Sequence, residues 1–257
     1  MRIASWNVNS IKMRLPIVCD WLKSQSPDVL LLQELKCETD AFPRMEIESL
    51  GYHTLVKGQK AYNGVAILSK EQAVFRTDIL DGDETDLHSR YIEAEVKGWI
   101  IASIYLPNGN PLGSEKLPYK LRFMERLAAH AKKLYKEERP VVLGGDYNVI
   151  PVDADARHPE NWRNDALAQP QSRAHFNALL NMGYVDAFRA LHPDEIGAYT
   201  FWDYQAGAWP RDDGIRIDHL LTSPEASDKL LKCWIDKHPR GLEKASDHTP
   251  IIADFLA

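Results

Sequence analysis

The amino-acid sequence predicts an α/β sandwich, in which two sheets face each other and helices cover their outer sides. Three observations support this fold class. Short, almost continuously apolar segments are typical of strands that are buried on both faces. Segments with helical periodicity separate several of these strands, and the segments 61–69 and 91–105 resemble hairpins. Strands interspersed with helices in this way are typical of layered α/β folds.

Most of the predicted strands run directly into polar residues. Strands are expected at 3–6, 29–32, 99–104, 141–143, 215–217 and 251–253. Apolar stripes predict helices at 10–25 and 115–137, and a third helix is expected at 172–182. The polar residues should then gather at one end of the strands, where loops form a cleft.

The composition of the chain favours a single-domain, soluble protein and argues against a zinc-cluster or membrane protein. The chain of 257 residues lacks Gly/Ser linkers and internal repeats, so residues 1–257 are expected to form a single domain. Its three cysteines form no C-x-x-C pair, which argues for a reducing cytoplasm and against a zinc cluster. Neither an export signal nor a membrane-spanning run is found, so a soluble, cytoplasmic protein of bacterial type is expected. The net charge of −6 does not exclude nucleic acid, because phosphate binding needs only a local basic face.

Acidic and amide side chains follow or begin the predicted strands. They are Asn7, Glu34, Asp146, Asn148, Asp218 and Asp247. Any one of them can simply begin a turn or cap a helix, but six at corresponding positions indicate a shared site. Oxygen ligands without nearby cysteines suit Mg²⁺ or Mn²⁺ rather than zinc.

The motif Gly-Gly-Asp-Tyr-Asn at 144–148 is the sharpest local signal. Its two glycines allow a tight turn or a close approach of the backbone to a ligand. A carboxylate at Asp146 can orient and deprotonate a water molecule, and the amide of Asn148 can donate to a phosphoryl oxygen. The motif therefore predicts hydrolytic chemistry, although alone it is only suggestive.

A second motif, Ser-Asp-His at 246–248, supplies an imidazole. Asp218 is the candidate partner of His248, since a His–Asp pair would hold one tautomer and favour the charged imidazole beside a phosphate. His219 should face away from the cleft and is interpreted as structural. Tyr105, directly after the strand at 99–104, can donate to a phosphoryl oxygen or ionise beside a metal.

An ordered set of short motifs spans almost the whole chain. They are Trp6-Asn7-Val8-Asn9, Leu32-Gln33-Glu34, Asn63-Gly64-Val65-Ala66, Tyr105-Leu106-Pro107-Asn108, the segment 144–148, Tyr199-Thr200-Phe201-Trp202, Arg216-Ile217-Asp218 and Ser246-Asp247-His248. This set resembles the exonuclease III family, the apurinic/apyrimidinic endonuclease branch of the endonuclease/exonuclease/phosphatase superfamily. The resemblance implies a four-layer α/β sandwich of two packed mixed sheets flanked by helices. It also implies in-line hydrolysis of DNA assisted by Mg²⁺.

The resemblance further implies a role for each polar residue. Glu34 would be a principal metal ligand, with Asn7 and Asp247 close by. Asp146 would activate water or bind the metal. The candidate metal ligands are Asn7, Glu34, Asp146, Asn148, Asp247 and His248.

The same resemblance assigns the groups around the phosphate. Asn148 and Asn108 would hold it, Tyr105 would support the scissile group, and the Asp218–His248 pair would stabilise the transition state. The residues implied as catalytic are Tyr105, Asp146, Asn148, Asp218 and His248.

Substrate contacts are expected from an apolar slot and from two arginines. Phe201, Ile215 and Ile217 would form a slot for a base-less deoxyribose, which is easier to extrude than an intact nucleotide. Arg173 and Arg216 are the preferred phosphate contacts. The basic residues between 116 and 139 are interpreted instead as a solvated outer helix face. Backbone contacts read no sequence, so binding should depend on shape and lesion and weaken with salt.

Two positions depart from the pattern of some relatives. Asn9 stands where some carry aspartate, which puts metal occupancy in question. Ile215 stands where some place tryptophan against the extruded sugar.

The favoured interpretation is a monomeric, Mg²⁺-dependent repair phosphodiesterase in which Mn²⁺ can substitute. It would act on double-stranded DNA with abasic sites, nicks or 3′ ends, by incision 5′ to abasic sites, 3′→5′ exonuclease action or 3′-phosphate removal. No membrane is expected as a partner. One alternative is an enzyme of the same scaffold acting on a phospholipid or inositol phosphate. Another is a non-catalytic regulatory member that binds nucleic acid or protein. A panel of substrates that includes inositol phosphates and an abasic duplex distinguishes the phospholipid-type enzyme from a DNA nuclease. Wild-type protein without activity would support the non-catalytic member.

Overall fold

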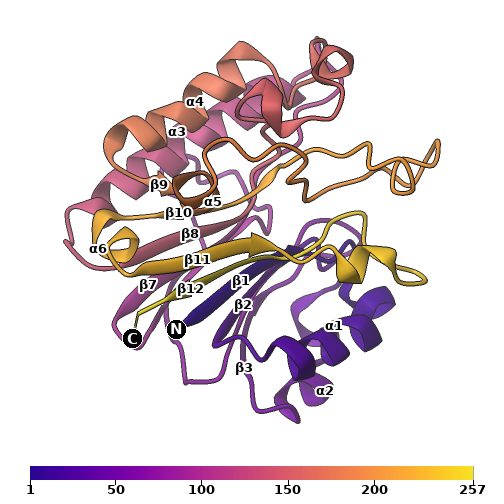
Figure 1. Ribbon diagram of the computed structural model, residues 1–257. Helices are drawn as coiled ribbons and strands as arrows, with labels where there is room; N and C mark the ends of the chain where they lie inside the picture. The colour runs from indigo at the N-terminus through magenta and orange to yellow at the C-terminus, as the bar shows by residue number, and fades with distance from the viewer. Residues whose placement is uncertain (257) are drawn as a thin grey trace.

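The computed structural model describes residues 1–256 and contains two six-stranded sheets stacked face to face (Figure 1). The strand order is β11-β12-β1-β2-β4-β3 in the first sheet and β5-β6-β7-β8-β10-β9 in the second. Only the β1–β2 and β7–β8 pairs are parallel among the described strand pairs, so both sheets are mixed. The predicted α/β sandwich is confirmed.

Strand bounds follow the order of the chain. The first sheet contains β1 (Arg2–Asn7), β2 (Val29–Gln33), β3 (His53–Lys57), β4 (Val65–Ser69), β11 (Leu230–Ile235) and β12 (Ile251–Phe255). The second contains β5 (Val74–Thr77), β6 (Tyr91–Val96), β7 (Trp99–Tyr105), β8 (Val141–Asp146), β9 (Val185–Asp186) and β10 (Asp218–Thr222).

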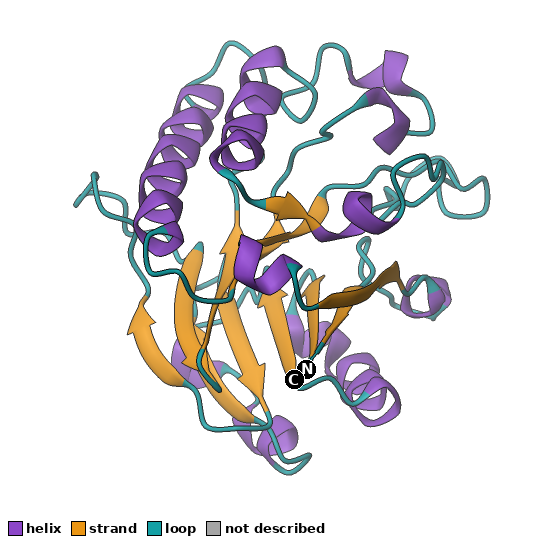
Figure 2. Ribbon diagram, turned by 60° about the vertical axis from the view of Figure 1, so that its left-hand side comes forward, coloured by secondary structure: helices purple, strands orange, loops and turns teal. Residues whose placement is uncertain are grey.

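Helices cover the outer faces of both sheets (Figure 2). They are α1 (Ile11–Gln25), α2 (Arg44–Glu48), α3 (Lys116–Tyr135), α4 (Pro170–Met182), α5 (Ala187–Leu191) and α6 (Pro224–Ser227). Short 3₁₀ helices occur at η1 (Thr39–Ala41), η2 (Asp153–Asp155), η3 (Pro159–Trp162) and η4 (His238–Gly241). The long helices α1, α3 and α4 match the three predicted ones to within a few residues. None of the helices within residues 1–256 combines the length and apolar character needed to cross a bilayer.

Three hydrophobic clusters explain the layering. One lies between the sheets and joins Ile3 and Leu31 of the first to Ile101 and Val142 of the second. Another packs the second sheet against α3 and α4, and a third packs the first sheet against α1. The central strands carry apolar side chains on both faces. For this reason their sequences are continuous apolar runs.

Two local expectations need correction. The hairpin expected within 61–69 is formed by β4 with the earlier strand β3. The segment 215–217 is not a strand, since β10 begins at Asp218, and Ile215 makes only isolated bridges to Ala156 and Phe201.

The two glycines of β8 allow close packing between strands and do not form a turn. A Cβ on Gly145 would lie 1.9 Å from the carbonyl oxygen of Ile104 in the adjacent strand β7. A Cβ on Gly144 would lie 2.6 Å from Leu31 Cδ1 of the facing sheet. Both positions therefore require close contact with neighbouring strands, not with a ligand.

Strand direction brings the polar residues to one edge. The parallel strands β1 and β2 end at Asn7 and just before Glu34, and the parallel strands β7 and β8 end at Tyr105 and Asp146. The antiparallel strand β10 begins there, because Asp218 pairs with Asp146. The ends of both sheets thus meet at one end of the sandwich.

Candidate active site

A cavity of about 350 Å³ opens at this end of the sandwich. The predicted site residues that line it are Glu34, Tyr105, Asn108, Asp146, Asn148, Phe201, Ile217, Asp247 and His248. They come from segments that lie far apart in the chain. Asn7 and Asp218 do not line the cavity but are hydrogen-bonded to residues that do. Asn7 contacts Glu34 and Asp146, and Asp218 contacts His248. The expected convergence is therefore present.

Two carboxylates form the acidic centre of the cavity. The Asn7 amide donates to Glu34 Oε1 and to Asp146 Oδ2, each at 2.9 Å, and so holds the two groups together. Burial of Glu34 favours its neutral form, but the Lys36 ammonium, 2.9 Å from Oε2, and the Asn7 amide outweigh this effect and lower the Glu34 pKa. Glu34 is consequently a charged carboxylate at neutral pH.

Asp146 and His248 form a buried pair with opposite tendencies. Burial raises the pKa of Asp146 to about 7, and the charge of His248 opposes that rise. Burial alone would lower the His248 pKa, but the Asp218 and Asp146 carboxylates outweigh it and raise the value to about 10. Nδ1 of His248 lies 2.7 Å from Asp218 Oδ2, and Nε2 lies 3.7 Å from Asp146 Oδ2. The two carboxylates therefore favour the imidazolium form of His248, and its Nε2 faces Asp146.

Two asparagines form a preorganised amide pair. Asn108 Nδ2 donates to Asn148 Oδ1 at 3.2 Å, and Asn148 Nδ2 donates to the Leu106 carbonyl at 2.8 Å. Asn148 has a left-handed backbone with φ of 48°, and its N–H donates to Asp146 Oδ1 at 2.9 Å. A non-glycine residue in this conformation is held there by its surroundings.

Lys120 is one of those surroundings, and its position corrects the expected solvated helix face. Its side chain is completely buried, and Nζ donates to the carbonyl oxygens of Asn148 at 2.6 Å, Asn108 at 3.1 Å and Ala166 at 3.4 Å. Burial lowers the pKa of this ammonium to about 7. Periodicity alone could not reveal it, because a lysine in a helix is usually solvated.

Tyr105 lies beside the acidic centre as a neutral phenol. Burial, followed by the charges of Glu34 and Asp146, raises its pKa well above the ordinary value. The Arg90 guanidinium lies 4.8 Å from the centre of the Tyr105 ring. Both roles considered for Tyr105, donation to a phosphoryl oxygen and ionisation beside a metal, stay predictions.

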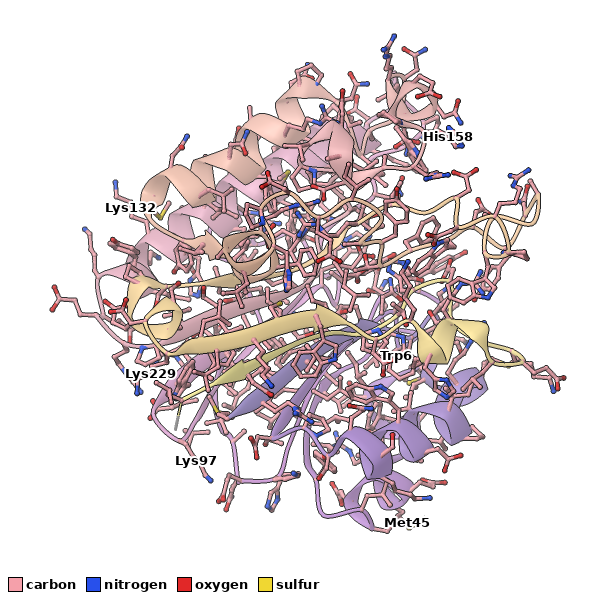
Figure 3. The ribbon with its side chains drawn as sticks, viewed as in Figure 1. Trp6, Met45, Lys97, Lys132, His158 and Lys229 are labelled. Atoms are coloured by element: carbon pink, nitrogen blue, oxygen red, sulfur yellow. The ribbon has the colours of Figure 1, made fainter. Side chains whose placement is uncertain are left out.

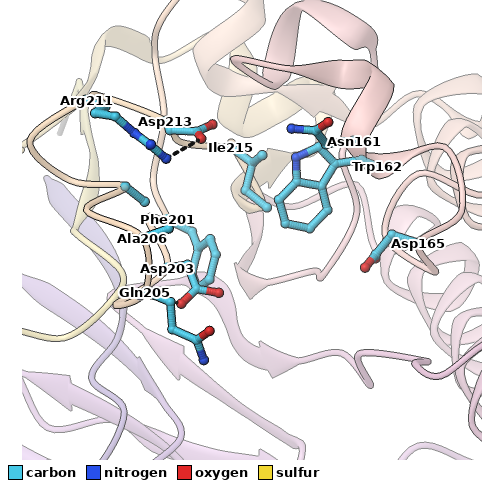
Figure 4. Close-up of a pocket in the computed structure, with 11 residues that line it drawn as sticks. Asn161, Trp162, Asp165, Phe201, Asp203, Gln205, Ala206, Arg211, Asp213 and Ile215 are labelled. Atoms are coloured by element: carbon cyan, nitrogen blue, oxygen red, sulfur yellow. Dashed lines mark hydrogen bonds and ion pairs between the residues drawn. The ribbon is translucent and has the colours of Figure 1, made fainter.

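The apolar slot has a wall that the sequence interpretation missed. Phe201 and Ile217 line the central cavity, whereas Ile215 lines an adjoining cavity of about 400 Å³. Trp162 lines both cavities and packs, like Phe201, against the apolar cluster that contains Ile215, which lies next to Trp162 in Figure 4. The only signal in the sequence was a large aromatic residue within the otherwise polar segment 160–165.

The two arginines chosen as phosphate contacts behave differently. Arg216 is completely buried and is bound by Asp155 Oδ1 and Asp186 Oδ2, each at 2.8 Å. A guanidinium so enclosed does not reach a phosphate, so the expected contact is wrong, and Arg216 is a core residue instead. Arg173 is partly exposed and pairs with Asp153 at 2.8 Å, outside the residues that line the central cavity. Its contact with DNA stays a prediction.

The donor set fits a hard divalent cation. One atom from each of Glu34, Asp146 and His248 lies within 4.8 Å of the other two. The two carboxylates can offer oxygen atoms to a cation, whereas a charged His248 has no free nitrogen lone pair, so its predicted role as a metal ligand stays a prediction. Asp247 adds a third carboxylate to the cavity wall, and no cysteine lines it. Carboxylate and amide oxygens of this kind suit Mg²⁺ or Mn²⁺ better than zinc.

Comparison with known proteins places this geometry in a family. The model of the endonuclease/exonuclease/phosphatase family matches residues 4–248. The chain belongs to this family. Exodeoxyribonuclease III of Haemophilus influenzae is 31% identical over 266 residues, which cover 99% of this chain and 100% of the relative.

Solved structures of the endonuclease/exonuclease/phosphatase family agree over the full length. An AP endonuclease from Archaeoglobus fulgidus is 38% identical with a TM-score of 0.96, and the match covers 100% of both chains. The 3′ phosphatase NExo from Neisseria, solved with a product DNA hairpin, is 37% identical with a TM-score of 0.95 and the same coverage. The predicted exonuclease III/AP endonuclease branch and enzyme class are thereby confirmed. The roles of individual site residues stay predictions.

Proposed function

We propose that this DNA repair nuclease cleaves phosphodiester bonds with the help of Mg²⁺, both 5′ to abasic sites and at blocked 3′ ends of duplex DNA. The observation that carries the proposal is the Glu34–Asp146 pair, bridged by Asn7 and facing the imidazolium of His248. An acidic centre next to fixed hydrogen-bond donors suits the hydrolysis of a charged phosphate.

A cation held by Glu34 and Asp146, with Asn7 and Asp247 nearby, would neutralise the phosphate and polarise it. The residues of the chain supply the rest. Asp146, in its ionised form, accepts a proton from the attacking water as the water oxygen bonds to phosphorus. The bond from phosphorus to the 3′ oxygen breaks, and that oxygen leaves as an alkoxide that takes up a proton from solvent water to become a hydroxyl group.

Hydrogen-bond donors that line the same cavity stabilise the charge that develops on the phosphoryl oxygens. They are the His248 Nε2–H, the amides of Asn148 and Asn108, and the phenol of Tyr105. Because hydrogen bonds within the protein already orient His248, Asn148 and Asn108, little reorganisation is needed in the transition state. Asp218 keeps His248 oriented and charged through the hydrogen bond at Nδ1.

The neighbouring apolar slot favours a nucleotide that has lost its base. Phe201, Ile217 and Trp162 offer apolar surface to a deoxyribose, while an abasic nucleotide is already unstacked and leaves the helix at low cost. All of these groups come from one chain, so we expect a monomer to be active. We further expect DNA binding through phosphate contacts, with Arg173 among the candidates.

One labelled duplex series tests the proposal. Duplexes with an abasic site, a nick, a 3′-phosphate or a recessed end are incubated with Mg²⁺, Mn²⁺ or EDTA. We expect cleavage with either cation, no cleavage in EDTA, and a loss of at least about 10³-fold in kcat for Asp146→Asn. Asp194→Asn, an exposed carboxylate, serves as the matched control.

Two outcomes would count against this function. Cleavage that persists in EDTA would contradict a metal-dependent mechanism. Inert wild-type protein that still binds DNA would favour the non-catalytic alternative. An inositol phosphate in the same panel tests the phospholipid-type alternative, and its turnover in preference to DNA would reassign the substrate.

A further inference from the structure

Lys120 places an amine in the interior that the hydrolytic steps above do not use. It lies in the first turns of α3 and is completely buried. No carboxylate of residues 1–256 lies within ion-pairing distance of its Nζ. Its partners are instead three backbone carbonyls, those of Asn108, Asn148 and Ala166. A buried amine without an ion-pair partner at contact distance is costly in its charged form, so a packing role alone does not account for it.

The three carbonyls belong to three segments that build the cavity. Asn108 follows β7, Asn148 follows β8, and Ala166 belongs to the loop between η3 and α4. The first two contribute their own amides to the site, and the third segment contributes Trp162 and Leu167 to its wall. One ammonium group therefore ties together the phosphate-binding amides and one side of the sugar slot.

The surrounding backbone is shaped to admit this side chain. Gly109 has φ of 94°, and a Cβ there would lie 2.8 Å from Lys120 Cδ and 2.9 Å from Ala166 Cβ. The absence of a side chain at Gly109 thus lets the lysine stem pass between two loops. The closest contact, 2.6 Å, is to the carbonyl of Asn148, whose backbone is left-handed. The ammonium is bound most closely where the backbone conformation is least favourable.

We infer that Lys120 is a positioning residue, which fixes the amides of Asn108 and Asn148 against the substrate phosphate by binding their carbonyl oxygens. The inference rests on the proposed function, since it assumes that these amides contact a scissile phosphate. Removal of the N–H donors leaves the carbonyls of Asn108 and Asn148 without this partner, whereas the Ala166 carbonyl still accepts from Ser172 Oγ at 2.7 Å. The two asparagine peptide groups then turn away from their present orientation. Displacements of about 1 Å at reacting groups can lower a rate about 100-fold.

The test compares Lys120→Met, which keeps the length of the stem but loses the donors, with Lys132→Met. Lys132 lies on the exposed side of the same helix and projects into solvent (Figure 3). Steady-state kinetics use a duplex with one abasic site and Mg²⁺, below the melting temperature of every variant. We expect kcat to fall about 30- to 100-fold for Lys120→Met, with KM changed less than about threefold. Lys132→Met should retain the wild-type kcat.

A double-mutant cycle separates positioning from general support of the fold. If Lys120 acts through the Asn108 amide, Lys120→Met should cost at least about fivefold less in kcat when Asn108 is already alanine. A merely structural lysine gives effects that multiply, and that result would overturn the inference. A folded Lys120→Met with a kcat within threefold of wild type would overturn it as well.

Two further outcomes are distinguishable. If Lys120→Met does not fold, Lys120→Gln, which keeps two donors, is assayed in the same cycle and judged by the same ratios. If the wild-type protein does not cleave the abasic duplex, the proposed function fails before any variant is compared. Failure of the positioning role alone leaves wild-type cleavage intact.

Discussion

Trp162 forms the aromatic wall between the central and the adjoining cavity, and it is only partly buried. We predict that Trp162→Ala lowers kcat/KM on an abasic duplex about tenfold, because the sugar loses apolar contact worth about 1–2 kcal/mol. Trp162→Phe, which keeps an aromatic ring, should stay within about threefold of wild type. Steady-state assays measure both variants. An unchanged kcat/KM for the alanine variant would remove Trp162 from the substrate site.

Asn9 offers a second test at the acidic edge. Its amide donates to Asp247 Oδ1 at 3.0 Å, and its side-chain oxygen accepts from Lys36. In Asn9→Asp this hydrogen bond is replaced by two carboxylates in contact, which repel each other unless a cation lies between them. We predict a several-fold lower Mg²⁺ concentration for half-maximal activity, together with a lower melting temperature in EDTA.

The two parts of that prediction are measured separately. Mg²⁺ titration of cleavage gives the first, and thermal unfolding with and without Mg²⁺ gives the second. Asn9→Ala is the control, since it loses the hydrogen bond without adding charge. Equal Mg²⁺ requirements in wild type and Asn9→Asp would show that position 9 does not influence the cation.

Individual residues could be predicted only where position along a strand determined their place. Glu34, Asp146 and Asp218 were identified because parallel and antiparallel strand ends meet at one edge. Arg216 and Lys120 were misjudged for the opposite reason. Their burial depends on partners far away in sequence, and a basic residue in a loop or helix carries no local mark that it is enclosed.

At the level of elements, β8 is the most tightly constrained strand. Gly145 meets the backbone of β7, where a Cβ would overlap the Ile104 carbonyl at 1.9 Å. We predict that Gly145→Ala separates β8 from β7 and lowers the free energy of unfolding by more than about 4 kcal/mol, beyond the range of most point mutants. Denaturant unfolding followed by circular dichroism measures the change.

Gly98 provides the matched control for that variant. It also has a positive φ, of 81°, but nothing lies within 4 Å of the position that a Cβ would take. Gly98→Ala should therefore cost only about 1 kcal/mol, from backbone strain alone. Similar losses in the two variants would mean that strand contact at Gly145 is not the cause.

Element types were more predictable than element ends. The apolar stripe of α3 and the buried runs of β1, β2, β7 and β8 determined their type, because burial on one stripe or on two faces leaves a clear pattern. The segment 215–217 carries the same apolar pattern, but Ile215 and Ile217 pack into a cluster with Leu167 rather than into a sheet. An apolar sequence pattern predicts that a segment is buried, but it does not predict whether the segment packs in a sheet or against a loop.

For the molecule as a whole, stability depends on pH through a buried ionic network. It joins Arg216 to Asp155, Asp186 and His219. His219 is completely buried, and its Nδ1 lies 3.0 Å from Arg216 Nη1 while Nε2 lies 3.1 Å from the Val149 carbonyl. The assigned neutral tautomer accepts from Arg216 and donates to Val149. Burial, together with the charge of Arg216, lowers the His219 pKa to about 4 from an ordinary value of 6.5.

The direction of the pH effect follows from that shift. Below pH 6.5 the unfolded chain binds a proton at His219 that the folded protein does not bind until about pH 4, so stability falls as the pH decreases between these values. The loss between pH 7 and pH 5 should be about 2 kcal/mol from this residue. In His219→Gln, which cannot titrate, that part of the pH dependence should disappear even if the variant is less stable throughout. Denaturant unfolding at pH 7 and pH 5 gives the change in the free energy of unfolding for each protein. If this change is the same in wild type and His219→Gln, His219 is not the group that makes stability depend on pH.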